Sequence, residues 1–208
     1  MSRPEMSDDA IFKALRKQLL ADPENPNLYY NVGLMYARRG QLDEAISAFN
    51  RAVLLKPDMV QAYVNLGGIF LRKGNLELCA EANIRALKID PNFALAHLNL
   101  GIAYEQSGKL DDAVSAYTRA LEIQPDLPQA HANLGRTHLA LGDADKAIES
   151  NLQALQIEPR FVLAHNNLAH AYARKGDYPA AIEHADQAVK MGLPVSAELL
   201  DELDKHRS

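Results

Sequence analysis

An asparagine recurs every 34 residues along this chain, each time within an apolar stretch. The set is Asn31, Asn65, Asn99, Asn133 and Asn167. Proline keeps the same interval at Pro57, Pro91, Pro125 and Pro159, and glycine keeps it at Gly40, Gly74, Gly108, Gly142 and Gly176. Self-similarity with a period of about 20 to 50 residues is typical of chains that stack one supersecondary unit on the next. The interval therefore predicts a linear array and not a fold built around a single core.

Glycine and proline divide each unit into two helical segments. The glycine lies between two apolar patterns of helical period, where a left-handed residue commonly ends a helix. The proline ends the second pattern, because it has no N–H for the next helical hydrogen bond. The units then span 26–59, 60–93, 94–127, 128–161 and 162–195. No segment shows convincing strand-like alternation, so an all-α chain of stacked antiparallel helix pairs is predicted.

The detailed pattern resembles the tetratricopeptide repeat family over residues 26 to about 195. Its signature W-x₂-L-G-x₂-Y…A-x₃-F…P is met in the third unit by His97, Leu100, Gly101, Tyr104, Ala113, Tyr117 and Pro125. Three units depart from it, with Asn83, Asn151 and Ala185 in the phenylalanine position. The resemblance implies a right-handed superhelical solenoid whose first helices line a concave groove that binds peptides. The repeats look most like the repeat arm of the protein O-linked N-acetylglucosamine transferases and like stand-alone bacterial scaffold proteins.

Partial units flank the array at both ends. Residues 8–20 fall in phase with the second helix of a missing unit, so residues 1–25 are expected to form an N-terminal capping half-repeat. Residues 196–208 are expected to form a C-terminal capping helix, with Ser196 as its N-cap. Arrays of this kind need end caps with polar outer faces.

Composition narrows the class of partner. A net charge of −5 argues against nucleic acid, because phosphate binding needs a basic surface. The single cysteine fits a reducing compartment. The N-terminus has no secretory pattern, and no apolar run reaches the roughly 18 residues of a membrane span. A cytoplasmic, soluble protein is the expectation.

The resemblance to the family implies that all five asparagines point into the concave groove. A carboxamide both donates and accepts hydrogen bonds, so a row of them could hold the backbone of an extended peptide whatever its side chains. The alternative is that each amide bonds to its neighbours and only supports the fold. Leu98 and Ile102 are further groove candidates, and they could equally pack between adjacent helices.

Basic residues outnumber acidic ones at the predicted groove positions. Arg38, Arg72, Arg136 and Arg174 are basic there, against Glu105 alone. An acidic partner segment is one inference. Arg136 is the strongest candidate, because the other three lie in the last turns of their helices, where cations favour the helix dipole in any case.

The sequence offers no catalytic or metal-binding constellation and implies no cofactor. His97, His131 and His165 lie one repeat apart in a packing position, whereas zinc ligands must converge within about 2.0–2.3 Å of one ion. Cys79 occupies a small-residue core position, and no phosphate-binding glycine loop is present.

The favoured hypothesis is thus a non-enzymatic scaffold that binds a protein or peptide segment. A second is a self-assembling homo-oligomeric scaffold, of the pilus-assembly or magnetosome-associated type, in which the half-repeat docks on a neighbour. A third is a substrate-recruiting subunit of a separate transferase.

Overall fold

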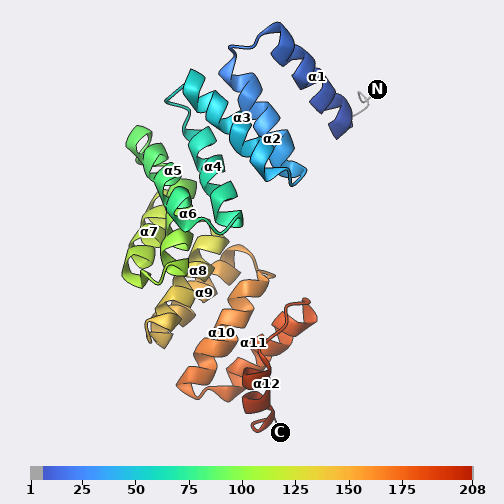
Figure 1. The fold of residues 1–208 in the computed structure, drawn as a ribbon. Helices are drawn as coiled ribbons and strands as arrows, with labels where there is room; N and C mark the ends of the chain where they lie inside the picture. The colour runs from blue at the N-terminus through green and yellow to red at the C-terminus, as the bar shows by residue number, and fades with distance from the viewer. Residues whose placement is uncertain (1–6, 208) are drawn as a thin grey trace. The chain divides into compact units, whose positions relative to one another are not determined.

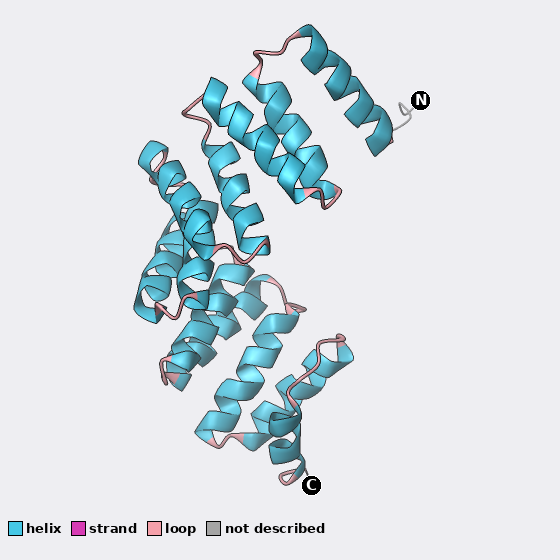
Figure 2. Ribbon diagram, viewed as in Figure 1, coloured by secondary structure: helices cyan, strands magenta, loops and turns pink. Residues whose placement is uncertain are grey.

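The computed structural model describes residues 7–207, and every regular element within them is a helix (Figures 1 and 2). The helices are α1 (Asp8–Ala21), α2 (Pro26–Arg38), α3 (Leu42–Leu55), α4 (Val60–Arg72), α5 (Leu76–Ile89), α6 (Ala94–Gln106), α7 (Leu110–Ile123), α8 (Pro128–Ala140), α9 (Ala144–Ile157), α10 (Val162–Lys175), α11 (Tyr178–Lys190) and α12 (Ala197–Asp204). The predicted all-α fold of antiparallel helix pairs is confirmed. Two compact units divide the chain between Asn99 and Leu100, inside α6.

Turn chemistry fixes where the helices end. Gly40, Gly74, Gly108, Gly142 and Gly176 all have positive φ, between 72° and 91°, in the turns between the two helices of each pair. An L side chain would be strained in that conformation, so glycine is the residue that permits the tight return. At helix starts, Asn75, Asp143 and Asp177 accept a hydrogen bond from the backbone N–H three residues on. The sequence therefore dictates both the length of each helix and its reversal.

Small residues lie where the two helices of a pair cross. Ala45, Cys79, Ala113, Ala147 and Ala181 are fully buried, as are Ala52, Ala86, Ala120, Ala154 and Ala188. Small side chains let the two backbones approach closely, and larger ones fill the space beside them. In the N-terminal unit, the ring of Phe49 lies so close to Gly33 that a Cβ there would come within 2.8 Å of it.

The polar residues in the phenylalanine position are buried in the same place. Asn83 is fully buried beside Gly67 in the N-terminal unit, and Asn151 is fully buried beside Gly135 in the C-terminal unit. Each donates from Nδ2 to a carbonyl one turn back, Cys79 O at 2.8 Å and Ala147 O at 2.7 Å. A buried amide is tolerated because its hydrogen bonds are made.

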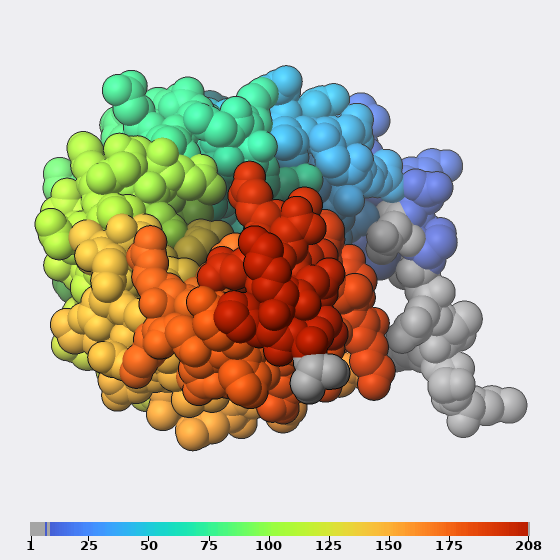
Figure 3. All heavy atoms as spheres, turned by 90° about the horizontal axis from the view of Figure 1, so that it is seen from below, coloured from blue at the N-terminus to red at the C-terminus, as the bar shows by residue number. Residues whose placement is uncertain are grey.

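The C-terminal helix packs on the last pair. Leu199 and Leu203 of α12 are buried in a cluster with Ala169, Ala185 and Ala188 of α10 and α11, and Figure 3 shows the red atoms of α12 beside the orange ones of that pair. Among the described residues, no helix is long and apolar enough to cross a membrane.

Candidate partner-binding site

The five asparagines of the repeat differ in exposure and in bonding. Asn31 is exposed on α2, whereas Asn65 on α4 is half-buried. Asn65 Nδ2 donates to Gln61 O at 2.8 Å on its own helix and to the hydroxyl of Tyr30 at 3.2 Å on the preceding first helix. The fourth and fifth, Asn133 and Asn167, are buried, with 5% and 8% of their surface exposed.

Two of these amides tie one repeat to the next. Asn99 Nδ2 donates to Val64 O at 3.4 Å and to Asn83 Oδ1 at 3.3 Å. In the C-terminal unit the same pair of bonds runs from Asn167 Nδ2 to Ala132 O at 2.9 Å and to Asn151 Oδ1 at 3.0 Å. An amide nitrogen carries two hydrogens. Both hydrogens of Asn99 and of Asn167 are therefore used inside the fold, and only the carboxamide oxygen is left to face a peptide.

Sequence reasoning missed these partners, although a signal for them exists. It treated Asn83 and Asn151 as departures from the family pattern, while the structure makes them the acceptors for Asn99 and Asn167. In both cases the two asparagines are 16 residues apart. Where an aromatic residue occupies that position instead, as Phe49 does, the following amide Asn65 bonds to Tyr30.

Arg136 is held in a bidentate ion pair with Glu105. Its Nε and Nη2 donate to Glu105 Oε1 and Oε2, both at 2.8 Å, and the hydroxyl of Tyr117 donates to Oε2 at 2.8 Å. Only 11% of the Glu105 side chain is exposed, against 47% for Arg136. The hydrogen bonds to Glu105 raise the pKa of Arg136, and burial together with Glu105 raises the pKa of Tyr117 far above its usual value. Glu105 therefore largely neutralises the charge of Arg136, and its hydrogen bonds join α6 to α7 and α8.

The other three arginines are on first-helix ends. Arg174 Nη1 donates to Leu139 O at 2.7 Å, which joins α10 to α8. Arg38 and Arg72 are exposed in the last turns of α2 and α4, and neither forms an ion pair with another described residue. Of the apolar candidates, Leu98 is buried with 5% exposed, whereas Ile102 is half-buried.

His97, His131 and Cys79 make contacts that support the fold. Nε2 of His97 lies 3.0 Å from Pro91 O, and Nε2 of His131 lies 2.9 Å from Pro125 O. A carbonyl can only accept, so these rings donate to the turn before their helix. Burial raises the pKa of Cys79 to about 11, which keeps its thiol protonated at neutral pH. Within residues 7–207 no three His, Cys, Asp or Glu side chains converge on a point where a metal ion could bind.

Family models for the tetratricopeptide repeat match most of the chain. One matches residues 98–160, 132–192 and 166–200, a second matches 33–74, and a third matches 58–126. A search of curated protein sequences found no match.

Solved structures share the fold. The MamA protein is 25% identical, with 81% of this chain and 92% of that chain covered and a TM-score of 0.70. YrrB, described as a TPR protein with an unusual peptide-binding site, is 20% identical over 93% of this chain and 99% of its own, with a TM-score of 0.73. PilW, a type IV pilus biogenesis factor, is 24% identical over 92% of this chain and 88% of its own, with a TM-score of 0.77.

Proposed function

Because this chain belongs to the tetratricopeptide repeat family, we propose that it is a non-enzymatic scaffold that binds an acidic segment of another protein. The binding surface is the first-helix face of the N-terminal unit, defined here as Asn31 and Arg38 on α2 with Arg72 on α4. The observation that supports it is that these three polar side chains are all exposed. Asn65, by contrast, has its amide nitrogen engaged within the fold.

The charge of this face argues for the acidity of the partner. Arg38 and Arg72 occupy the same position in successive first helices, 34 residues apart, so their guanidinium groups repeat along the stack. The whole chain has a net charge of −5, which makes a local basic pair a distinguishing feature. Guanidinium groups recognise carboxylates bidentately. Asn31, about two turns before Arg38 on α2, adds a donor and an acceptor for the backbone of the bound segment.

The asparagine row has a reduced role in this proposal. A ladder like that of the transferase arm requires amides that are available to a peptide. The hydrogens of Asn99 and Asn167 are committed to the neighbouring repeat, so we assign these two to the fold.

The test compares two double variants that change the charge equally. Arg38→Glu with Arg72→Glu reverses the first-helix face, while Lys56→Glu with Lys88→Glu reverses two exposed lysines at the ends of α3 and α5. Proteins captured by each variant and by the wild type are quantified by mass spectrometry, and the captured partner is then titrated as purified protein. We expect the first variant to lose the partner and the second to keep it. Equal capture by both variants, with folding intact by circular dichroism, contradicts the proposal.

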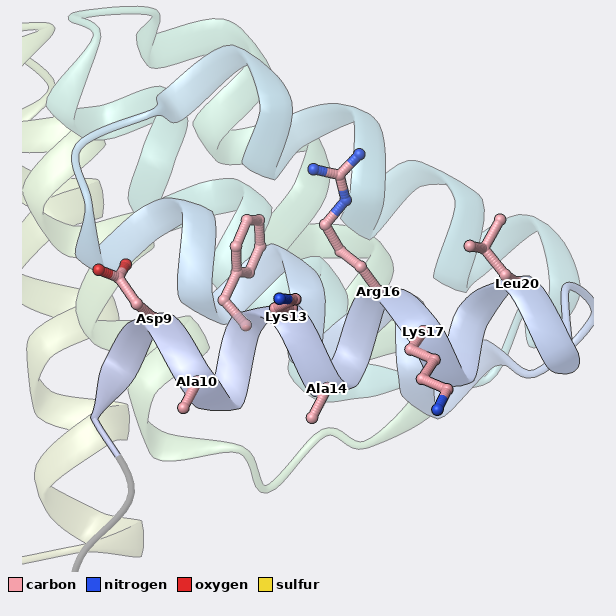
Figure 4. Close-up of a pocket in the computed structure, with 8 residues that line it drawn as sticks. Asp9, Ala10, Lys13, Ala14, Arg16, Lys17 and Leu20 are labelled. Carbon is pink, nitrogen blue, oxygen red and sulfur yellow. The ribbon is translucent and has the colours of Figure 1, made fainter.

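Self-assembly is a second candidate, because part of α1 is left uncovered. α1 and α3 have the same length and are 34 residues apart. Phe49 and Ala45 of α3 are fully buried, whereas their counterparts Leu15 and Ile11 remain partly exposed. A depression on α1 is lined by Asp9, Ala10, Phe12, Lys13, Ala14, Arg16, Lys17 and Leu20 (Figure 4). Leu20 is 86% exposed, and docking on a second copy would bury it.

A matched pair of leucines tests this candidate. Leu20 and Leu54 occupy the same position in α1 and α3 and are 86% and 66% exposed. Sedimentation velocity over a hundredfold concentration range would show association in the wild type and in Leu54→Glu, and its loss in Leu20→Glu. A wild-type protein that stays monomeric throughout removes the candidate.

A further inference from the structure

Two imidazoles meet between the helices of the last pair. His165 on α10 and His184 on α11 have their Nδ1 atoms 2.9 Å apart, with ring centroids at 5.1 Å. His165 is buried, with 8% of its surface exposed, and His184 is half-buried. Two nitrogens at that distance share one hydrogen, so one ring donates and the other accepts.

A carbonyl oxygen decides which ring donates. Nε2 of His165 lies 3.3 Å from Pro159 O, and a carbonyl can only accept, so His165 carries its hydrogen on Nε2. The neutral His165 ring then presents a lone pair at Nδ1. His184 therefore donates from Nδ1, and its Nε2 has the lone pair. The proline contact is the one that His97 and His131 make in their own repeats, so the fifth unit adds a second imidazole to a recurring device.

The surroundings disfavour added charge. The ring of Tyr172 on α10 stacks on His184 with an interplanar angle of 4° and centroids 5.7 Å apart. Burial, followed by the nearby His165, lowers the pKa of His184, and the carboxylate of Glu183 on α11 opposes this. The charged or titratable groups that face His184 are His165 and Tyr172 of α10 and Glu183 of its own helix.

We propose that the His165–His184 pair is a pH-sensitive lock that holds α11 against α10. One added proton on the pair leaves the N–H···N bond intact but places a positive charge between two packed helices. A second added proton would leave an N–H group on each Nδ1 and a positive charge on each ring, face to face. That state cannot keep the 2.9 Å contact. Opening would release α11 and expose the buried cluster that Leu199 and Leu203 of α12 complete.

The direction of the pH effect follows from linkage. Because the folded pKa of His184 lies below the unfolded value of about 6.5, the unfolded state binds more protons in the interval between the two. The stabilisation from the neutral pair is complete above pH of about 6.5 and falls as the pH drops from there towards the folded pKa. Neutral pH therefore closes the lock, and mild acid opens it.

Hydrogen exchange of the full-length protein tests the lock. The variant His184→Gln keeps an amide donor for His165 Nδ1 but cannot titrate. The matched control is His131→Gln, since His131 makes the same proline contact in the preceding repeat. Exchange of the amides of α11 is followed by mass spectrometry from pH 7.5 to 5.0 and corrected for the intrinsic pH dependence. We expect protection of α11 to fall by about tenfold in the wild type and in His131→Gln. It should fall less than about twofold in His184→Gln.

The inference is overturned if His184→Gln loses protection as steeply as the wild type does, because other buried histidines such as His170 would then account for the effect. A second measurement on the unmodified protein does not depend on that variant folding. NMR titration of the imidazole Cε1 resonances should place the midpoint of His184 below its ordinary value. A midpoint at or above that value also overturns the lock.

Discussion

At the scale of single residues, the two helices of a pair can approach closely where a glycine lies against a buried side chain. Gly67 and Gly68 are neighbours on α4, and only Gly67 lies against such a side chain. A Cβ on Gly67 would lie 2.1 Å from Asn83 Nδ2, whereas a Cβ on Gly68 would have nothing within 4 Å. Asn83 cannot move away without losing its bonds to Cys79 O and Asn99. Both glycines lie in the interior of α4, so the difference between them comes from what packs against each.

We therefore predict opposite effects of two alanine substitutions. Gly67→Ala should lower the free energy of unfolding by about 1–3 kcal/mol through overpacking. Gly68→Ala should raise it by roughly 0.5–1 kcal/mol, because alanine favours a helix interior over glycine. Urea denaturation followed by circular dichroism measures both. Equal changes of the same sign would show that the Asn83 contact does not limit the packing.

At the scale of helices, ion pairs recur between residues 30 apart in successive units. A cation just after a first helix, or in its last turn, pairs with an acid on the preceding second helix: Arg39 with Asp9, Lys73 with Asp43, and Lys175 with Asp145. The third and fourth units break this series, with Ser107 and Leu141 at the position of the cation. Leu141 is 43% exposed, and Asp111 keeps the position of the acid. Each acid is exposed, so a single pair contributes little.

Restoring the series should stabilise the C-terminal unit slightly. Leu141→Lys should raise the free energy of unfolding by about 0.2–1 kcal/mol at low salt, while Leu141→Glu, which faces Asp111 with a like charge, should lower it by a similar amount. The difference between the two variants should shrink in 1 M NaCl, because salt screens exposed charges. A difference that is independent of salt would mean that the effect comes from losing the leucine side chain.

At the scale of the whole molecule, the contacts of each helix are mainly with the helices next to it in sequence. Within the N-terminal unit α2 packs on α3 and α4 on α5, and within the C-terminal unit α8 packs on α9 and α10 on α11. Stability in such an array is close to a sum of local terms and nearest-neighbour terms. Damage in one pair should therefore stay close to that pair.

We predict that Gly67→Ala accelerates hydrogen exchange in α4 and α5 and leaves α10 and α11 unchanged at pH 7.5. Exchange followed by mass spectrometry at the level of single helices would show this, with Gly68→Ala as the control. Uniform acceleration across all helices would indicate that the chain unfolds as one cooperative body instead.

The candidate site was predicted less completely than the fold. The sequence identified the arginines and asparagines of the first helices, but it could not show which of them the fold itself uses. Glu105 on α6 pairs with Arg136 on α8 although the two residues are 31 apart in the sequence, and that separation carries no local signal. The hydrogen bond from Asn99 to Asn83 likewise joins residues that are distant in the sequence, 16 apart. Which side chains bond across two helices depends on their rotamers and on the distance between the helices. Both follow only from the packed structure.

The sequence by itself determined that this chain is a stack of helix pairs, because a 34-residue period, turn glycines and small-residue positions act locally and leave the backbone little choice. Only the tertiary structure decided which polar groups remain free. Packing committed the amides of Asn99 and Asn167 to the neighbouring repeat and paired the charge of Arg136 with the largely buried Glu105. It left Arg38 and Arg72 exposed and brought His165 against His184. The surface available to a partner is what remains after those bonds are made.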